Sequence, residues 1–306
     1  MPDAPISETV APRMPSAPSH ALPTGACDAH THVFGPYDRF PFVTLSSYPP
    51  PLAPFELHKE MLKRIGAQRG VLVQPAPYGT DSSALVDALR KGNGQLRGIA
   101  VATEEITDKE LTALHEAGVR GLRFNEMIDS GTGKLFKGSV GVNQLKKLAP
   151  RMKELGWHAQ IWAKCADCVS ISRELAPLGL ALVFEHMTSF TVDNGTDDRA
   201  FQNLLALLQE GQVWVKLALC RVSKAFPDYT DARPFHDLLV EANSSHLLWA
   251  SDWPYVRMGD RSPDVGHLID LLSNWVNDAE IQNRILVENP DALYGFDPLC
   301  ANSSRS

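Results

Sequence analysis

Eight short apolar runs, separated by segments of helical periodicity, are the feature that most restricts the fold of this chain. Nearly all of the runs are continuously apolar, as expected for strands that are buried on both faces of a parallel sheet. The expected strands are 26–34, 70–77, 96–103, 121–125, 157–163, 180–187, 213–220 and 247–253. The segments between them place apolar residues three or four apart, which is typical of amphipathic helices. The expected helices are 82–91, 109–117, 143–155, 201–208, 234–242, 265–275 and 279–286.

This alternation between residues 26 and 296 predicts a (β/α)8 TIM barrel, distorted and formed by a single domain. A doubly wound open sheet also alternates strands and helices, but its glycine-rich first turn, Gly-x-Gly-x-x-Gly, is missing here. Residues 1–25 are rich in proline and have no apolar period, so we expect an extended or disordered N-terminal arm. Residues 297–306 are expected to form a short tail.

The charge of the chain restricts its partners. A formal net charge of −7 disfavours nucleic acid and anionic membranes as partners, because both require a basic face. No apolar run approaches the roughly 20 residues of a membrane-spanning helix, and the N-terminal residues do not resemble a secretory signal. We therefore expect a cytoplasmic protein; the sequence leaves monomer and homo-oligomer open.

The five cysteines are an odd number, spread thinly over a long chain, which indicates reduced thiols and no disulfide framework. Cys165 and Cys168 have the C-x-x-C spacing of zinc and redox sites. No second pair completes a zinc site, so buried or surface thiols are the favoured interpretation.

Histidines and an aspartate stand where expected strands end. The first strand leads into Asp28-Ala-His30-Thr-His32, and alternate side chains of a strand share one face. The sixth strand ends with Glu185-His186 and the eighth with Ser251-Asp252-Trp253. Because barrel enzymes carry their chemistry at the C-terminal ends of strands, we expect His30, His32, His186 and Asp252 to share one site.

This combination resembles the amidohydrolase superfamily and, more closely, its 2-pyrone-4,6-dicarboxylate hydrolase-like lactonases. The resemblance extends from about Gly25 to Tyr294. It rests on residues 28–36, 74–81, 97–101, 121–125, 185–187, 251–254 and 289–294.

The resemblance implies hydrolysis of a small anionic lactone. Asp252 is then the general base on water, and His30, His32 and His186 polarise the lactone carbonyl. Arg123 and Tyr48 match residues that bind the substrate in that group. A carboxylate base and cationic or hydrogen-bonding electrophiles are what acyl transfer to water requires.

Two further residues are candidates for binding the substrate anion. Arg221 follows the seventh strand, and a guanidinium grips a carboxylate with two parallel hydrogen bonds. Asn125 lies two residues after Arg123 on the same strand face, where it can orient the guanidinium or the anion. Arg123 itself has no compensating charge nearby in the sequence, so we expect it to hold a substrate carboxylate or sulfonate.

The resemblance implies hydrolysis without a cofactor, and the residues themselves argue against a two-metal site. The fifth strand lacks the terminal histidine of two-metal amidohydrolases, the fourth lacks a bridging lysine, and Lys216 lies on the seventh strand, the wrong one for that bridge. A mononuclear zinc ion remains an alternative. Its ligands would be His30, His32, His186 and Asp252.

Departures from the dicarboxylate hydrolases point to a different anion. Residues 126–131 lack their second arginine, Trp162 replaces a tyrosine, and Tyr255 replaces a histidine and is followed by Arg257. Tyr255 is thus a further candidate for substrate contact, in a pocket expected to suit a monoanion better than a dicarboxylate. A decarboxylase or lactone isomerase of the same superfamily is the alternative activity.

Overall fold

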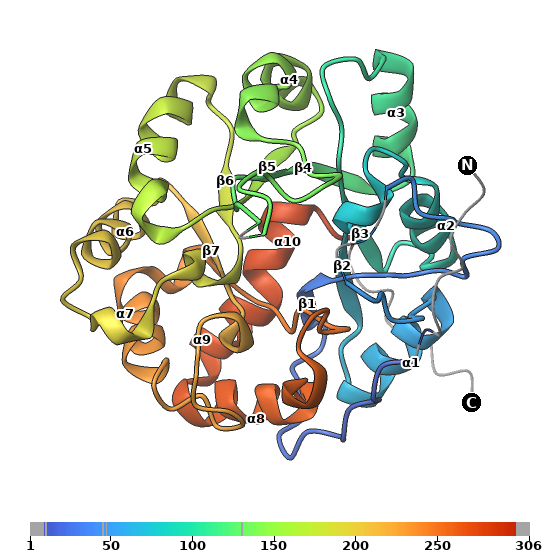
Figure 1. Cartoon of the computed structure of the whole chain (residues 1–306). Helices are drawn as coiled ribbons and strands as arrows, with labels where there is room; N and C mark the ends of the chain where they lie inside the picture. Colours follow the sequence, from blue (N-terminus) through green and yellow to red (C-terminus); the bar gives the residue numbers. More distant parts are fainter. Residues whose placement is uncertain (1–8, 10, 45, 47, 130, 298–306) are drawn as a thin grey trace.

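Eight parallel strands form the centre of the molecule in the computed structural model, which describes residues 9, 11–44, 46, 48–129 and 131–297. They are β1 (Cys27–Thr31), β2 (Arg69–Val73), β3 (Leu96–Ala100), β4 (Val119–Asn125), β5 (His158–Trp162), β6 (Leu182–Phe184), β7 (Trp214–Leu217) and β8 (Leu247–Trp249). Neighbours in the sheet follow chain order, and a parallel bridge from Thr31 to Trp253 joins its first and last members. The predicted (β/α)8 barrel is confirmed, with helices around the strands (Figure 1).

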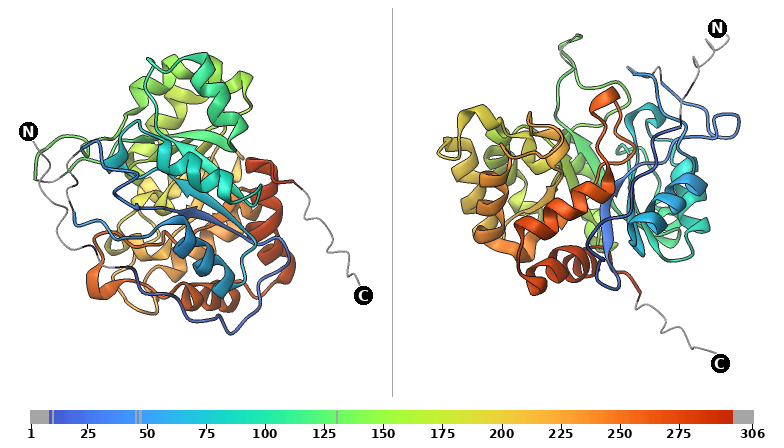
Figure 2. Two further views of the ribbon diagram at one scale, coloured as in Figure 1. Left: turned by 90° about the vertical axis from the view of Figure 1, so that its right-hand side faces the viewer. Right: turned by 90° about the horizontal axis from the view of Figure 1, so that it is seen from below.

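Helices cover the outside of the strands and one end of the barrel (Figure 2). They are α1 (Phe55–Ile65), α2 (Ser83–Lys91), α3 (Asp108–Glu116), α4 (Val142–Glu154), α5 (Cys165–Leu175), α6 (Arg199–Gln209), α7 (Arg233–Asn243), α8 (Val265–Trp275), α9 (Ala279–Asn283) and α10 (Asn289–Tyr294). The last helix, α10, lies across the ring of strands in Figure 1.

The sequence analysis missed two helices of the outer layer, α1 and α5. The buried face of α5 contains Cys165, Cys168 and Ser172, which weaken its apolar period. The buried face of α1 is apolar at Met61, Leu62 and Ile65, so a local apolar stripe was present there beside His58. The four described cysteines are buried and free, as expected for reduced thiols.

Most strands end earlier than predicted. The predicted site residues His186 and Asp252 therefore lie in the turns that follow the strands. The sixth and eighth runs were expected to reach residues 187 and 253, but β6 ends at Phe184 and β8 at Trp249. Beyond these points the backbone turns into the left-handed region, with φ of 51° at His186 and 64° at Asp252. Such conformations cost roughly 1–3 kcal/mol in a non-glycine residue and persist only where tertiary contacts hold them. Here the N–H of Asp252 donates to the carbonyl of His30 at 2.9 Å.

The described part of the N-terminal arm is extended and lies against α8. The backbone N–H of Ser16 donates to Asp264 at 3.0 Å, and that of Ser19 donates to Asp270 at 2.7 Å. The predicted tail, residues 297–306, lies outside the described residues except for Asp297. No helix within the described part of the chain has the length and apolarity needed to cross a bilayer.

Candidate active site

Three histidines and one aspartate meet at the C-terminal ends of the strands. The Nε2 atoms of His30 and His32 lie 3.6 and 3.4 Å from Oδ1 of Asp252. The ring of His30 is 4.9 Å, between centroids, from the rings of both His32 and His186. All four side chains are buried. The structure therefore brings together the four residues that the sequence analysis assigned to one site.

Asp28 was expected to share their face, and that expectation is wrong. The pairing of β1 with β2 shifts register between Asp28 and Thr31, which ends strict alternation at that point. Asp28 instead accepts hydrogen bonds from the N–H groups of Ser251 at 3.0 Å and His30 at 3.3 Å. Burial raises the pKa of its carboxyl to about 6.

The hydrogen bond made by Nδ1 of His32 determines whether its Nε2 can donate or accept. Nδ1 lies 2.7 Å from the carbonyl oxygen of Val73, which can only accept, so Nδ1 carries a proton. In a neutral ring Nε2 then presents a lone pair toward the carboxylate of Asp252. A favourable contact there needs a cation, which is either a second proton on the ring or a metal ion.

Asp252 is held ionised by its surroundings. Burial alone would raise its pKa, but Arg221, His186 and His32 outweigh that effect and hold the pKa well below its usual range. Nε of Arg221 donates directly to Oδ2 of Asp252, and Nη1 donates to the carbonyl of Val256 at 3.1 Å. Arg221 was predicted as a candidate clamp for the substrate anion; its guanidinium lines the cavity and also binds the carboxylate of Asp252.

Arg123 also has a carboxylate partner, although no compensating charge stands near it in the sequence. Nε and Nη2 donate to the two oxygens of Glu185 at 2.9 and 2.6 Å. Burial opposes ionisation of Glu185, but Arg123 and His186 lower its pKa to about 2. Glu185 was missed because its partner stands 62 positions away in the sequence. A carboxylate directly after a buried strand was the available signal.

A cavity opens over these groups. Seven predicted residues line it: His32, His186, Asp252, Arg123, Arg221, Tyr48 and Asn125. His30 is not part of its wall and lies deeper, against the rings of His32 and His186. The rest of the polar and aromatic part of the wall is formed by Phe34, Ser46, Phe136, Lys137, Trp162 and Arg257. The guanidinium carbon of Arg257 lies 5.3 and 4.7 Å from the ring centroids of Tyr48 and Phe136.

Two predicted substrate contacts have different surroundings from those expected. Asn125 lines the cavity, but its amide donates to Ser139 at 2.9 Å and its oxygen accepts from the N–H of Met127, so it does not orient Arg123. Tyr255 is buried and does not line the cavity. It is therefore not a wall contact as predicted, although the next two residues, Val256 and Arg257, do line the cavity.

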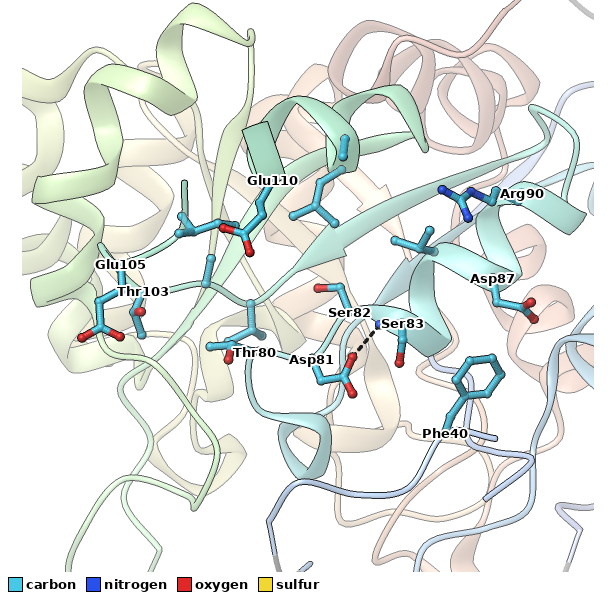
Figure 3. Close-up of a pocket in the computed structure, with 16 residues that line it drawn as sticks. Phe40, Thr80, Asp81, Ser82, Ser83, Asp87, Arg90, Thr103, Glu105 and Glu110 are labelled. Carbon is cyan, nitrogen blue, oxygen red and sulfur yellow. Dashed lines mark hydrogen bonds between the residues drawn. The ribbon is translucent and has the colours of Figure 1, made fainter. Parts of the chain in front are cut away.

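A larger hollow of about 1420 Å³ lies on the outside of the barrel, beside α2 and α3 (Figure 3). Two of its acidic groups cap the N-terminal ends of these helices: Asp81 accepts from the N–H of Ser83, and Glu110 forms a capping box with Thr107. A third, Asp87, forms ion pairs with Arg39 and Lys91. It contains none of the predicted site residues. Hence the cavity over Asp252 is the candidate active site.

The central cluster has the donor set for one divalent ion. Ligand atoms of His30, His32 and Asp252 lie within 4.8 Å of one another, as do those of His30, Glu185 and His186. Among the described residues, neither ring nitrogen of His30 has a hydrogen-bond partner. These residues fit a mononuclear ion, which would polarise a carbonyl and activate water when bound.

Comparisons with known proteins identify the family of this chain. Residues 27–296 match the model of the family described as Amidohydrolase. A 2-pyrone-4,6-dicarboxylate hydrolase of Comamonas testosteroni is 36% identical over 290 residues, which cover 92% of this chain and 93% of that protein. A 4-sulfomuconolactone hydrolase of Rhizobium radiobacter is 33% identical, with coverage of 93% and 95%. A crystal structure named as a 2-pyrone-4,6-dicarboxylic acid hydrolase of Pseudomonas putida has a TM-score of 0.76 at 29% identity, covering 90% of this chain and 100% of that one.

Proposed function

Because the chain belongs to the amidohydrolase family, we propose that it opens a small anionic lactone by hydrolysis. The observation that carries this proposal is the meeting of His32, His186 and Asp252 with two arginines in one cavity. A carboxylate, imidazole rings and guanidinium groups together provide a base, electrophiles and anion-binding groups. These are the parts that hydrolysis of an anionic ester needs.

In this proposal Asp252 receives the proton of the attacking water. Its ionised state at neutral pH keeps an acceptor available, and the adjacent imidazole rings face the place where charge develops on the lactone carbonyl oxygen. Of the three histidines, His32 and His186 line the cavity and are assigned the direct contacts. His30 is assigned the support of both rings.

We propose that the reaction does not require a metal ion. The guanidinium groups of Arg123 and Arg221 already pair with the buried carboxylates of Glu185 and Asp252. A doubly protonated His32 provides the cation that its contact with Asp252 needs, and such a ring is also a strong electrophile. The alternative is a single zinc ion on His30, His32, His186 and Asp252.

We assign the substrate anion to the outer edge of Arg123. Within the described part of the chain, three of its N–H groups have acceptors, two on Glu185 and one, at 3.4 Å, on the carbonyl of Gln74. A guanidinium has five N–H donors, so two remain for a ligand. One carboxylate or sulfonate matches that capacity.

A substrate panel tests the reaction class. Muconolactones, pyrone carboxylates and sugar-acid lactones should include a compound whose opening releases one proton per turnover, and Asp252→Asn should abolish that activity. Failure of the whole panel, or full activity of Asp252→Asn, contradicts the proposal. Product mass separates the alternatives, since hydrolysis adds water, isomerisation adds nothing and decarboxylation loses carbon dioxide.

A further inference from the structure

One lysine is enclosed in the barrel interior and has no role in the reaction described above. Lys216, on β7, is fully buried. Its Nζ donates to the carbonyl oxygen of Ala29 and to Oε1 of Gln160, both at 2.6 Å. Burying an ammonium group is costly unless its hydrogen bonds are well placed, so the contacts of this lysine call for an explanation.

The lysine determines which way the amide of Gln160 points. An ammonium group only donates, so the amide oxygen of Gln160 must face Lys216. The amide nitrogen then faces Glu185 and donates to Oε1 at 2.5 Å. A reversed amide would bring its NH2 group against the ammonium and its oxygen against a carboxylate. Lys216 therefore selects the only orientation in which Gln160 supports Glu185.

Glu185 in turn supports Arg123. The oxygen that accepts from Gln160 also accepts from Nε of Arg123, and the other oxygen accepts from Nη2. The guanidinium is thereby held at the cavity wall, with its carbon 5.6 Å from the ring centroid of Trp162. Strand register reinforces this arrangement, because Arg123 on β4 pairs directly with Gln160 on β5.

We propose that Lys216 is a positioning residue for the substrate anion, acting through Gln160 and Glu185 on the guanidinium of Arg123. The inference rests on the proposed function in one respect, the assignment of Arg123 to the substrate anion. We name the chain Lys216–Gln160–Glu185–Arg123 the interior relay. Its effect on specificity is distinct from the chemistry at Asp252.

Kinetics on a matched pair of lactones test the relay. Lys216→Met removes the ammonium and keeps most of the side-chain volume. For an anionic lactone we expect kcat/KM to fall about 5- to 100-fold, mainly through KM, the range expected for coupled neighbours. For the same lactone with its anion esterified we expect less than about a 3-fold change, because that substrate does not use Arg123. Equal losses on both substrates overturn the proposal.

A double-mutant cycle excludes a general loss of packing. If Lys216 acts through Arg123, adding Lys216→Met to Arg123→Met should cause little further loss on the anionic lactone. Fully additive losses contradict the relay. His158→Leu is the matched control, since His158 is also buried in the interior and no hydrogen bond joins its side chain to the relay among the described residues. This variant should keep the wild-type preference for the anionic substrate.

Two further measurements keep the inference testable. If Lys216→Met does not fold, Gln160→Leu breaks the same relay without removing a charge and should give the same selective loss. A crystal structure of either variant should show Glu185 and Arg123 displaced from their wild-type positions. If the wild-type protein opens no lactone, the proposed function has failed. The crystal structure of the variant then tests the interior relay independently of activity. Unmoved Glu185 and Arg123 side chains would then refute it.

Discussion

Two pairs of arginines stand at opposite ends of the barrel, and they are used differently. At the N-terminal ends of the strands, Arg69 and Arg97 bind the segment that follows α10. Arg69 donates to Asp291 and to the carbonyl of Asp297 at 2.8 Å, and Arg97 donates to the carbonyl of Gly295 at 2.7 Å. Both guanidinium groups lie about 5 Å from the ring of Phe296. These arginines fasten the C-terminal segment across the end of the barrel.

At the opposite end, Arg123 and Arg221 bind carboxylates inside the barrel and also line a cavity. A guanidinium saturated by backbone carbonyls and an aromatic ring has little to offer a ligand. One that shares a buried carboxylate and faces a cavity keeps N–H groups for an incoming anion. This difference distinguishes arginines that stabilise the fold from arginines that are available to bind a ligand, although all four are mostly buried.

The sharpest test of this contrast replaces one aspartate by asparagine at each end of the barrel. Asp252→Asn removes the proposed base, and kcat should fall about 10²–10⁴-fold or more. Asp291→Asn weakens the contact with Arg69, and we expect a lower unfolding temperature with nearly unchanged kcat. Steady-state kinetics and thermal unfolding of both variants measure the two effects. A large loss of kcat in Asp291→Asn would remove the distinction between the two ends.

The next largest effect is expected from the arginines themselves. Arg123→Met should reduce kcat/KM for an anionic lactone about 30- to several-thousand-fold, because a charge-assisted bidentate contact is lost. Lactones without the anion should be affected much less.

Glu185 complicates that variant, because it is left buried without its partner. Arg123→Met combined with Glu185→Gln removes the orphaned charge and should show the same selectivity. Arg69→Met is the control at the other end and should lower the unfolding temperature without changing substrate preference. Similar damage to charged and uncharged substrates in both Arg123 variants would assign Arg123 to the fold.

Much of this architecture is predictable from the sequence, because strands buried on both faces are continuously apolar and their C-terminal ends meet at one edge. That geometry alone brings together His30, His32, His186 and Asp252. Of the two helices that were missed, α5 packs cysteines where a regular apolar stripe would be expected, whereas α1 has a local apolar stripe beside His58.

Pairings between distant strands are what the sequence does not reveal. Arg123 and Arg221 were predicted as ligand-binding groups, and nothing local to either indicates that Glu185 and Asp252 neutralise them. The irregularity in β1 that separates Asp28 from the two histidines is equally hidden, because it depends on the pairing with β2.

A smaller effect concerns stability and pH. Burial lowers the pKa of Lys216 to about 7, against an ordinary value of 10.5, although Glu185 acts in the opposite direction. Between these pH values the unfolded chain binds one proton more than the folded chain, so raising the pH favours folding. The difference in unfolding free energy between wild type and Lys216→Met should therefore shift in favour of wild type as pH rises from 7 to 10. The slope is at most about 1.4 kcal/mol per pH unit.

Denaturant unfolding at several pH values measures this difference. Lys224→Met is the control, since its side chain is 60% exposed and pairs only with Asp193 at the surface among the described residues. A flat difference for Lys216→Met across this range would mean that the ammonium keeps its ordinary pKa in the folded protein.

Removal of divalent ions should have the smallest effect on activity. This experiment decides whether the cavity end of the barrel holds a metal ion. If a doubly protonated His32 supplies the positive charge beside Asp252, untagged protein should contain substoichiometric zinc, and its activity should survive chelation. Elemental analysis and assays before and after dialysis against a chelator measure both quantities. Stoichiometric zinc with chelator-sensitive activity would instead make His30, His32 and His186 metal ligands. The contrast between the two ends would then be one between a metal site and a structural clamp, and the interior relay would orient the anion toward that metal.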